Sequence, residues 1–157
     1  MIEKKYMRIL FLLYLLMILR FIVFKYPIVQ LRDIALTWSR DVIWEGLYKA
    51  NFEFFRTIKL YTRYWSYKEI NSFANLIGNI LAFIPLSYML PRVYKPAQKF
   101  LICMFLSFLV VLGIELFQLL TSFGVFDVDD IILNMSGAFI GYLCYLFMKA
   151  IFKKKNI

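Results

Sequence analysis

The chain has 157 residues, of which 62% are hydrophobic and 20% aromatic, and its mean hydropathy is +0.70. This composition excludes an ordinary water-soluble domain and predicts one integral membrane domain that covers residues 1–157. The absence of histidine and the presence of only two cysteines exclude a zinc site of the usual Cys/His type, and in a membrane protein a net charge of +9 indicates lipid contact and orientation, with no nucleic acid as partner.

The first apolar run covers residues 7–24 and is about as long as a membrane-spanning helix. Basic residues precede it, as they do in a signal peptide, but no cleavage site of small residues follows it. We therefore predict that residues 7–24 are a retained first crossing.

Residues 25–72 are long, mixed in charge and predicted to lie outside the membrane on the extracytoplasmic side. Apolar residues recur there at helical spacing, and polar residues occupy the other side of the same helix. The apolar set is Leu31, Ile34, Ala35, Trp38 and Val42, and the polar set is Arg32, Asp33, Ser39 and Arg40. This pattern predicts an amphipathic helix at the membrane surface.

All three tryptophans, Trp38, Trp44 and Trp65, lie in this segment, where they are predicted to act as interfacial anchors. Two roles for the segment stay open. It is either a helical flap that covers the bundle or a segment that grips an anionic lipid headgroup. The candidate headgroup contacts are Arg56, Lys59 and Arg63.

Three further apolar runs predict crossings at residues 73–90, 100–120 and 131–152. The predicted fold is therefore an all-α membrane bundle of four transmembrane helices, with the amphipathic segment between the first and the second. The N-terminus, the linker 91–99 and the tail are rich in Lys and Arg, whereas the loop 121–130 has none. The positive-inside rule then predicts that both termini are cytoplasmic and that the acidic loop faces outward.

This orientation brings polar residues of three crossings to the same depth of the outer leaflet. We predict a ligand-binding pocket formed by Asn75, Asn79, Glu115, Gln118, Asp127, Asp129, Asp130 and Asn134. Burying a carboxylate inside a membrane helix costs free energy, so we predict that Glu115 has a functional role. Simpler roles are a helix cap for one of the three aspartates and interhelical hydrogen bonds for the asparagines.

Glycines are expected to let the crossings approach closely at this level. Gly137 and Gly141 form a GxxxG pair in the fourth crossing, and Gly78 and Gly113 lie level with the polar groups.

These residues resemble the VanZ-like family of small bacterial membrane proteins, which is named for a teicoplanin resistance factor. The family pattern is N-x-x-G-N-x-x-x-F-x-P-x-G, then E-x-x-Q, then F-D-x-D-D-x-x-x-N-x-x-G-x-x-x-G. The matching residues are Asn75, Gly78, Asn79, Phe83 and Pro85, then Glu115 and Gln118, then Phe126, Asp127, Asp129, Asp130, Asn134, Gly137 and Gly141. The resemblance covers roughly residues 50–145.

Three positions depart from the family pattern. Ser87 stands where glycine is usual, and Gly124 stands where an arginine is often found. A weaker upstream element, NFEFFRTI at residues 51–58, has Phe54 in place of a proline.

The resemblance implies a protein of the bacterial cell membrane that supports resistance to teicoplanin-type lipoglycopeptides. Its expected partner is a membrane lipid, a cell-wall lipid intermediate or the antibiotic itself, and no cofactor is required. The alternative is a metal-dependent enzyme that acts on a polyprenyl-phosphate or phospholipid head, with Mg²⁺ or Ca²⁺ on oxygen ligands. The metal candidates are Glu115, Asp127, Asp129 and Asp130, and the catalytic candidates are Glu115, Asp127 and Asp130. An ion pathway ranks last, because the inner halves of the crossings are nearly all apolar.

Overall fold

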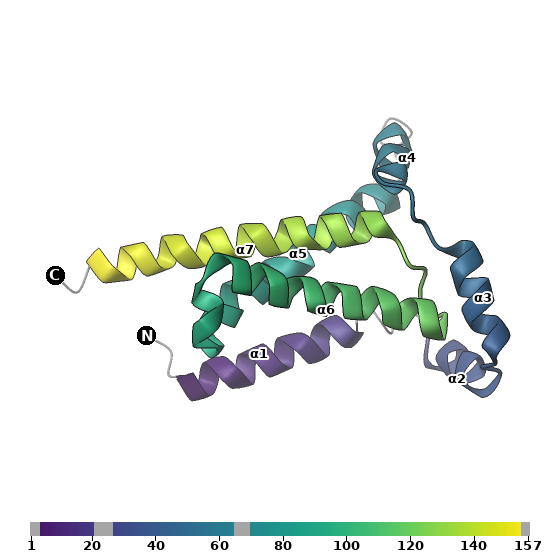
Figure 1. Cartoon of the computed structure of the whole chain (residues 1–157), viewed down its shortest axis with the longest axis horizontal. Helices are drawn as coiled ribbons and strands as arrows, with labels where there is room; N and C mark the ends of the chain where they lie inside the picture. Colours follow the sequence, from purple (N-terminus) through teal and green to yellow (C-terminus); the bar gives the residue numbers. More distant parts are fainter. Residues whose placement is uncertain (1–3, 21–26, 65–69, 155–157) are drawn as a thin grey trace.

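The computed structural model describes residues 4–20, 27–64 and 70–154, and the regular elements in these ranges are all helices. Figure 1 shows their order along the chain. The elements are α1 (Lys4–Ile18), α2 (Ile28–Leu36), α3 (Arg40–Lys49), α4 (Arg56–Tyr64), α5 (Ile70–Val93), the short 3₁₀ helix η3 (Lys95–Gln98), α6 (Phe100–Thr121) and α7 (Val128–Lys154).

Three of the described helices are long and apolar enough to cross a membrane. The spans are Asn75–Val93 in α5, Phe100–Thr121 in α6 and Val128–Phe152 in α7. They correspond to the second, third and fourth predicted crossings, so this part of the prediction is confirmed. The first apolar run forms α1, but residues 21–24 lie outside the described residues. The first crossing therefore stays a prediction.

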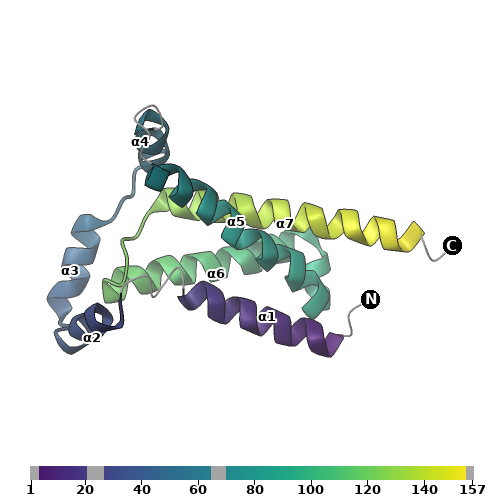
Figure 2. The ribbon, with the colours of Figure 1, turned by 180° about the vertical axis from the view of Figure 1, so that it is seen from behind.

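The helices run alternately up and down, so the chain has two distinct ends (Figures 1 and 2). The N-terminus, the C-terminus and the turn that holds η3 lie at one end. The opposite end carries α2, α3 and α4 together with the connection between α6 and α7. The three basic segments are thus gathered at one end, although the side of the membrane that this end faces stays a prediction.

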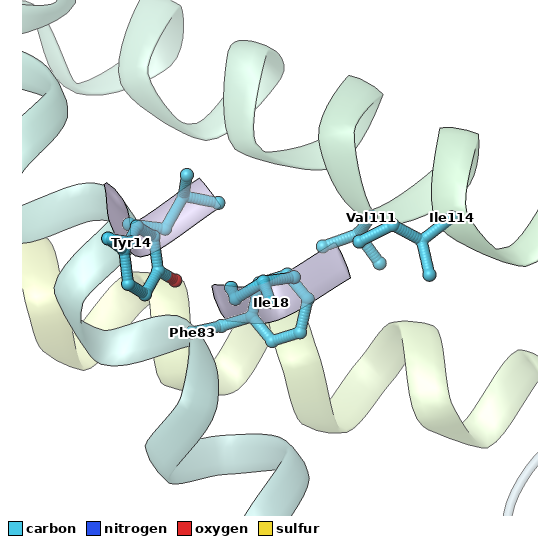
Figure 3. Packing of buried hydrophobic residues seen from close by; sticks show 6 residues of the cluster. Tyr14, Ile18, Phe83, Val111 and Ile114 are labelled. Atoms are coloured by element: carbon cyan, nitrogen blue, oxygen red, sulfur yellow. The ribbon is translucent and has the colours of Figure 1, made fainter. Parts of the chain in front are cut away.

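The core lies where α1, α5 and α6 meet. Figure 3 shows Tyr14 and Ile18 of α1 beside Phe83 of α5 and beside Val111 and Ile114 of α6, all of them buried. The Tyr14 hydroxyl also donates a hydrogen bond to the Ala82 carbonyl at 2.7 Å. Close packing and this polar contact hold α1 against α5 and α6.

Glycine brings α5 and α7 into backbone contact. A Cβ atom added at Gly137 would lie 2.0 Å from the Ile80 carbonyl oxygen, and one at Gly141 would lie 2.0 Å from that of Ile84. The GxxxG prediction is therefore confirmed. The same expectation was wrong for Gly78 and Gly113, because a Cβ atom there would meet nothing within 4 Å.

The segment before α5 is divided into separate short helices. The spacing predicted one helix through Val42, but α2 ends at Leu36, so this prediction was wrong. The hydroxyl and the backbone N–H of Thr37 both donate to the Asp33 carbonyl, which closes the last turn of α2. Ser39 is extended, and α3 begins after it.

α3 covers the end of α6, whose last carbonyls have no partner within their own helix. Trp38, just before α3, donates its indole N–H to the Leu120 carbonyl at 2.9 Å. Gly46 of α3 lies against the Leu119 carbonyl, where a Cβ atom would be 2.6 Å from the oxygen. Trp38 thus caps a helix, Trp44 is exposed, and Trp65 lies outside the described residues. Whether this segment rests on the membrane surface stays a prediction.

The Gly137→Ala variant should destabilise the bundle by about 1–3 kcal/mol, because the added methyl forces α7 away from the Ile80 carbonyl. Gly113→Ala is the matched control, since it adds a helix-favouring methyl in open space and should stabilise by up to about 1 kcal/mol. Unfolding in mixed micelles measures both changes. Equal stabilities for the two variants would contradict the assigned contact.

Candidate functional site

The candidate site lies at the hinge between α6 and α7, next to the loop that leads into α4. α6 ends at Thr121, and Ser122 turns the chain out of the helix with a φ of 55° in the left-handed region. The chain then passes through Gly124, where an added Cβ atom would collide with the Gln118 side chain. α7 begins directly after Asp127.

Asp127 caps α7 and also holds the loop before α4. Its Oδ1 accepts the backbone N–H of Asp129 at 2.8 Å, which is the bond of an N-cap residue. The same oxygen accepts Asn51 Nδ2 at 2.8 Å, and Oδ2 accepts the Thr57 hydroxyl at 2.6 Å. The expectation that one aspartate caps this helix is therefore confirmed, and Asp127 is that residue.

The backbone joins the same two segments. The Asn51 N–H donates to the Phe126 carbonyl at 2.9 Å, and the Val128 N–H donates to the Asn51 carbonyl at 3.1 Å. The Asn51 side-chain oxygen accepts the N–H of Glu53 at 3.1 Å, which fixes the turn that follows. Asn51 is thus bonded through both its backbone and its side chain.

Asp129 caps the other helix, α4. Its Oδ1 accepts the Phe55 N–H at 2.5 Å, and its Oδ2 accepts the N–H groups of Thr57 at 2.7 Å and Ile58 at 3.1 Å. The side chain is fully buried, and Phe55 has a φ of 64°, which is unfavourable for a bulky residue. The three N–H bonds offset this strain and place a negative charge at the positive end of α4.

The three long helices add polar groups to the same hinge. Asn79 of α5 donates its Nδ2 to Asp130 Oδ1 at 2.6 Å, directly after the start of α7. Glu115 of α6 is 1% exposed, and its Oε2 accepts the Asp127 N–H at 3.2 Å. Gln118 is also buried on this side of α6. The hinge is therefore bonded to α5 and α6.

Asn134 is the remaining buried polar residue, one turn after Asp130. It is 1% exposed, and within the described ranges its Oδ1 is a buried side-chain oxygen without a hydrogen-bond partner. A buried acceptor left unpaired costs about 1–3 kcal/mol. Asn75, by contrast, is exposed.

The three candidate headgroup contacts lie apart from this network. Arg56, Lys59 and Arg63 follow one another at i, i+3 and i+7 in α4 and are exposed on one face of that helix.

Sequence reasoning did not identify Asn51 and Thr57 as partners of Asp127. The available signal was the NFEFFRTI element, because an Asn followed by a Thr before a helical run supplies a turn and a donor. The spacing alone does not indicate which carboxylate accepts the hydrogen bonds of Asn51 and Thr57.

The metal-dependent alternative stays a prediction. No group of three or more His, Cys, Asp or Glu side chains among them is arranged to hold a metal ion. Asp127 and Asp129 each place both carboxylate oxygens on N–H or O–H donors. These carboxylates therefore serve helix caps and, for Asp127, the side chains of Asn51 and Thr57.

Apolar grooves flank the long helices near the network. One, of about 590 Å³, lies between α6 and α7, and its lining residues are Phe108, Ile131, Ile132, Met135, Ser136, Phe139 and Ile140. It begins one residue after Asp130, on a neighbouring face of α7.

The chain matches the VanZ/LLP1 family over residues 11–149, from within α1 to near the end of α7. It belongs to the VanZ/LLP1 family. No curated protein and no solved structure matches the chain. The family match spans all residues of the capping network, from Asn51 to Asn134.

Asp129→Ala should loosen the start of α4, because the N–H groups of Phe55, Thr57 and Ile58 lose their acceptor. A loss of about 1–3 kcal/mol corresponds to roughly 5- to 150-fold faster amide exchange at these positions. Hydrogen–deuterium exchange measures the change. Asp41→Ala, at an exposed acid in the first turn of α3, is the control and should leave these amides unchanged. Unchanged exchange in Asp129→Ala would contradict the cap.

Proposed function

We propose that this protein of the VanZ/LLP1 family lies in the bacterial cell membrane and supports resistance to teicoplanin-type lipoglycopeptides. In this proposal both termini are cytoplasmic and the capping network faces outward. The gathering of the basic segments at the opposite end supports this orientation, because cytoplasmic ends of membrane proteins are enriched in Lys and Arg.

The observation that carries the proposal is the unpaired Oδ1 of Asn134 beside a buried carboxylate network. Most polar groups of the network have internal partners, which explains why they are stable in this setting. Asn134 Oδ1 has no internal partner that offsets its burial. It is suited to a hydrogen-bond donor from a ligand, such as an amide, hydroxyl or ammonium group. The headgroup of a lipid, a cell-wall lipid intermediate and a lipoglycopeptide all carry such donors.

The groove between α6 and α7 is consistent with a ligand that has a polar head and an apolar tail. Its residues Ile131 and Met135 lie at the same depth of α7 as Asn134, and its lining is almost entirely apolar. A polar head at the hinge would therefore leave an apolar tail beside the groove. Lipid intermediates and lipoglycopeptides share this division into head and tail.

Asn134 is 1% exposed, and in this proposal a ligand reaches it when the loop at residues 51–58 moves away from the start of α7. This loop is held by Asp127 and Asp129, so its bonds set how often the network opens. The exposed basic face of α4 moves with the loop and would meet anionic headgroups first.

Susceptibility to teicoplanin in a sensitive host tests the network. Glu115→Gln, Asp127→Asn and Asp130→Asn should each lower protection towards that of cells without the protein, because each removes a charge from the site. Glu45→Gln is the control, since Glu45 is an exposed acid of α3 whose ion pair with Lys49 contributes little. Full protection by all three variants, at matched protein level, would refute a role for the network.

Asn134→Leu separates ligand binding from folding. Leucine removes an unpaired buried amide, so the variant should fold with equal or greater stability, while a ligand loses its acceptor. We expect normal thermal stability in detergent together with reduced protection. Unreduced protection by a well-folded Asn134→Leu protein would contradict the role of this residue.

A further inference from the structure

A second polar site lies at the opposite end of the bundle, where α5, η3 and α7 meet. The Arg92 guanidinium lies 3.7 Å from the centre of the Tyr88 ring and 5.4 Å from that of Tyr145. Its Nη1 donates to the Tyr88 carbonyl at 2.6 Å. Lys149 Nζ lies 5.7 Å from the same Tyr145 ring and 3.4 Å from Gln98 Oε1. Two cations from different helices thus flank one tyrosine.

Among the described residues, this end of the bundle carries no Asp or Glu. The sequence has no Asp or Glu between Glu69 and Glu115, and none after Asp130. The helix C-termini of α5 and α7 offer only partial negative charge. Within the described ranges, Arg92 and Lys149 contact only aromatic rings and neutral oxygens, so their charges are suited to an anionic ligand.

An apolar groove includes Tyr88, the residue on whose ring Arg92 lies. It has a volume of about 460 Å³, and its lining residues are Tyr88, Leu143, Cys144, Phe147 and Met148. Tyr88 belongs to both features, since one of its ring faces carries Arg92. The groove therefore starts at the ring that carries Arg92 and continues along α7 towards the middle of the span.

We propose that Arg92 and Lys149 bind the phosphate of an anionic phospholipid whose acyl chain lies in this groove. Tyr88 orients the guanidinium, and the N–H donors of Arg92 other than the one on the Tyr88 carbonyl are suited to phosphate oxygens. Lys149 adds a second, more mobile charge. The acyl chain covers apolar surface that a free phosphate leaves bare, so the groove favours a lipid. This site is separate from the hinge and does not depend on the function proposed for it.

Native mass spectrometry of the full chain, with phosphatidylglycerol and phosphatidylcholine of the same acyl chains, tests the proposal. We expect phosphatidylglycerol to be retained preferentially, and Arg92→Gln or Lys149→Gln to reduce that preference severalfold. Lys5→Gln is the matched control, because it removes one charge from an exposed residue at the same end of the bundle and should have no effect. Equal retention of the two lipids, or equal effects of Lys5→Gln and Arg92→Gln, would overturn the site.

Two further arms separate a lipid from a free anion and a binding defect from misfolding. Leu143→Trp fills the groove while leaving both cations, so it should reduce phosphatidylglycerol retention as strongly as Arg92→Gln. Excess glycerol phosphate, which has the charge without the acyl chains, should not displace the lipid. Displacement by glycerol phosphate, or full retention in a folded Leu143→Trp protein, would show that the groove holds no acyl chain.

Discussion

The capping of two helix N-termini by one short acidic motif is the interaction on which the hinge end of this protein depends. A helix that starts in or near a membrane exposes N–H groups that neither its own backbone nor lipid can satisfy. Asp127 and Asp129, two residues apart, satisfy those of α7 and α4 respectively. Alternate residues at the start of a helix point in different directions, so one motif joins two helices. The loop at residues 51–58 is thereby fixed onto the start of α7.

The glycine contact between α5 and α7 determines which polar groups can reach that motif. Gly137 and Gly141 allow the backbones of the two helices to touch along the Ile80 and Ile84 carbonyls. Asn79, one residue before Ile80, is then within 2.6 Å of Asp130. Side chains larger than glycine would separate the helices and lengthen this bond. The close packing of α5 against α7 is therefore needed for the hydrogen bond between Asn79 and Asp130.

The two ends of the bundle differ in net charge, and each carries one of the two proposed sites. The hinge end gathers carboxylates and amides, with an unpaired acceptor at Asn134. The end with the termini gathers cations, with Arg92 and Lys149 around aromatic rings beside an apolar groove. A protein that protects the membrane from an amphipathic antibiotic would need an outward polar site and a stable position among anionic lipids. The two proposed sites supply these separately.

The sequence by itself determined the three described spans, their order, the charge difference between the ends and the family, because hydropathy, basic residues and motif spacing are local properties of the chain. It also identified the acidic hinge and the GxxxG contact. Only the tertiary structure decided that Asp129 caps α4 and that Asn51 and Thr57 bond Asp127, since these partners are some seventy residues apart. It likewise separated α2 from α3, where the Trp38 indole reaches the end of α6. Hydrogen bonds at helix ends depend on where distant backbones meet, and periodicity along one helix does not encode that position.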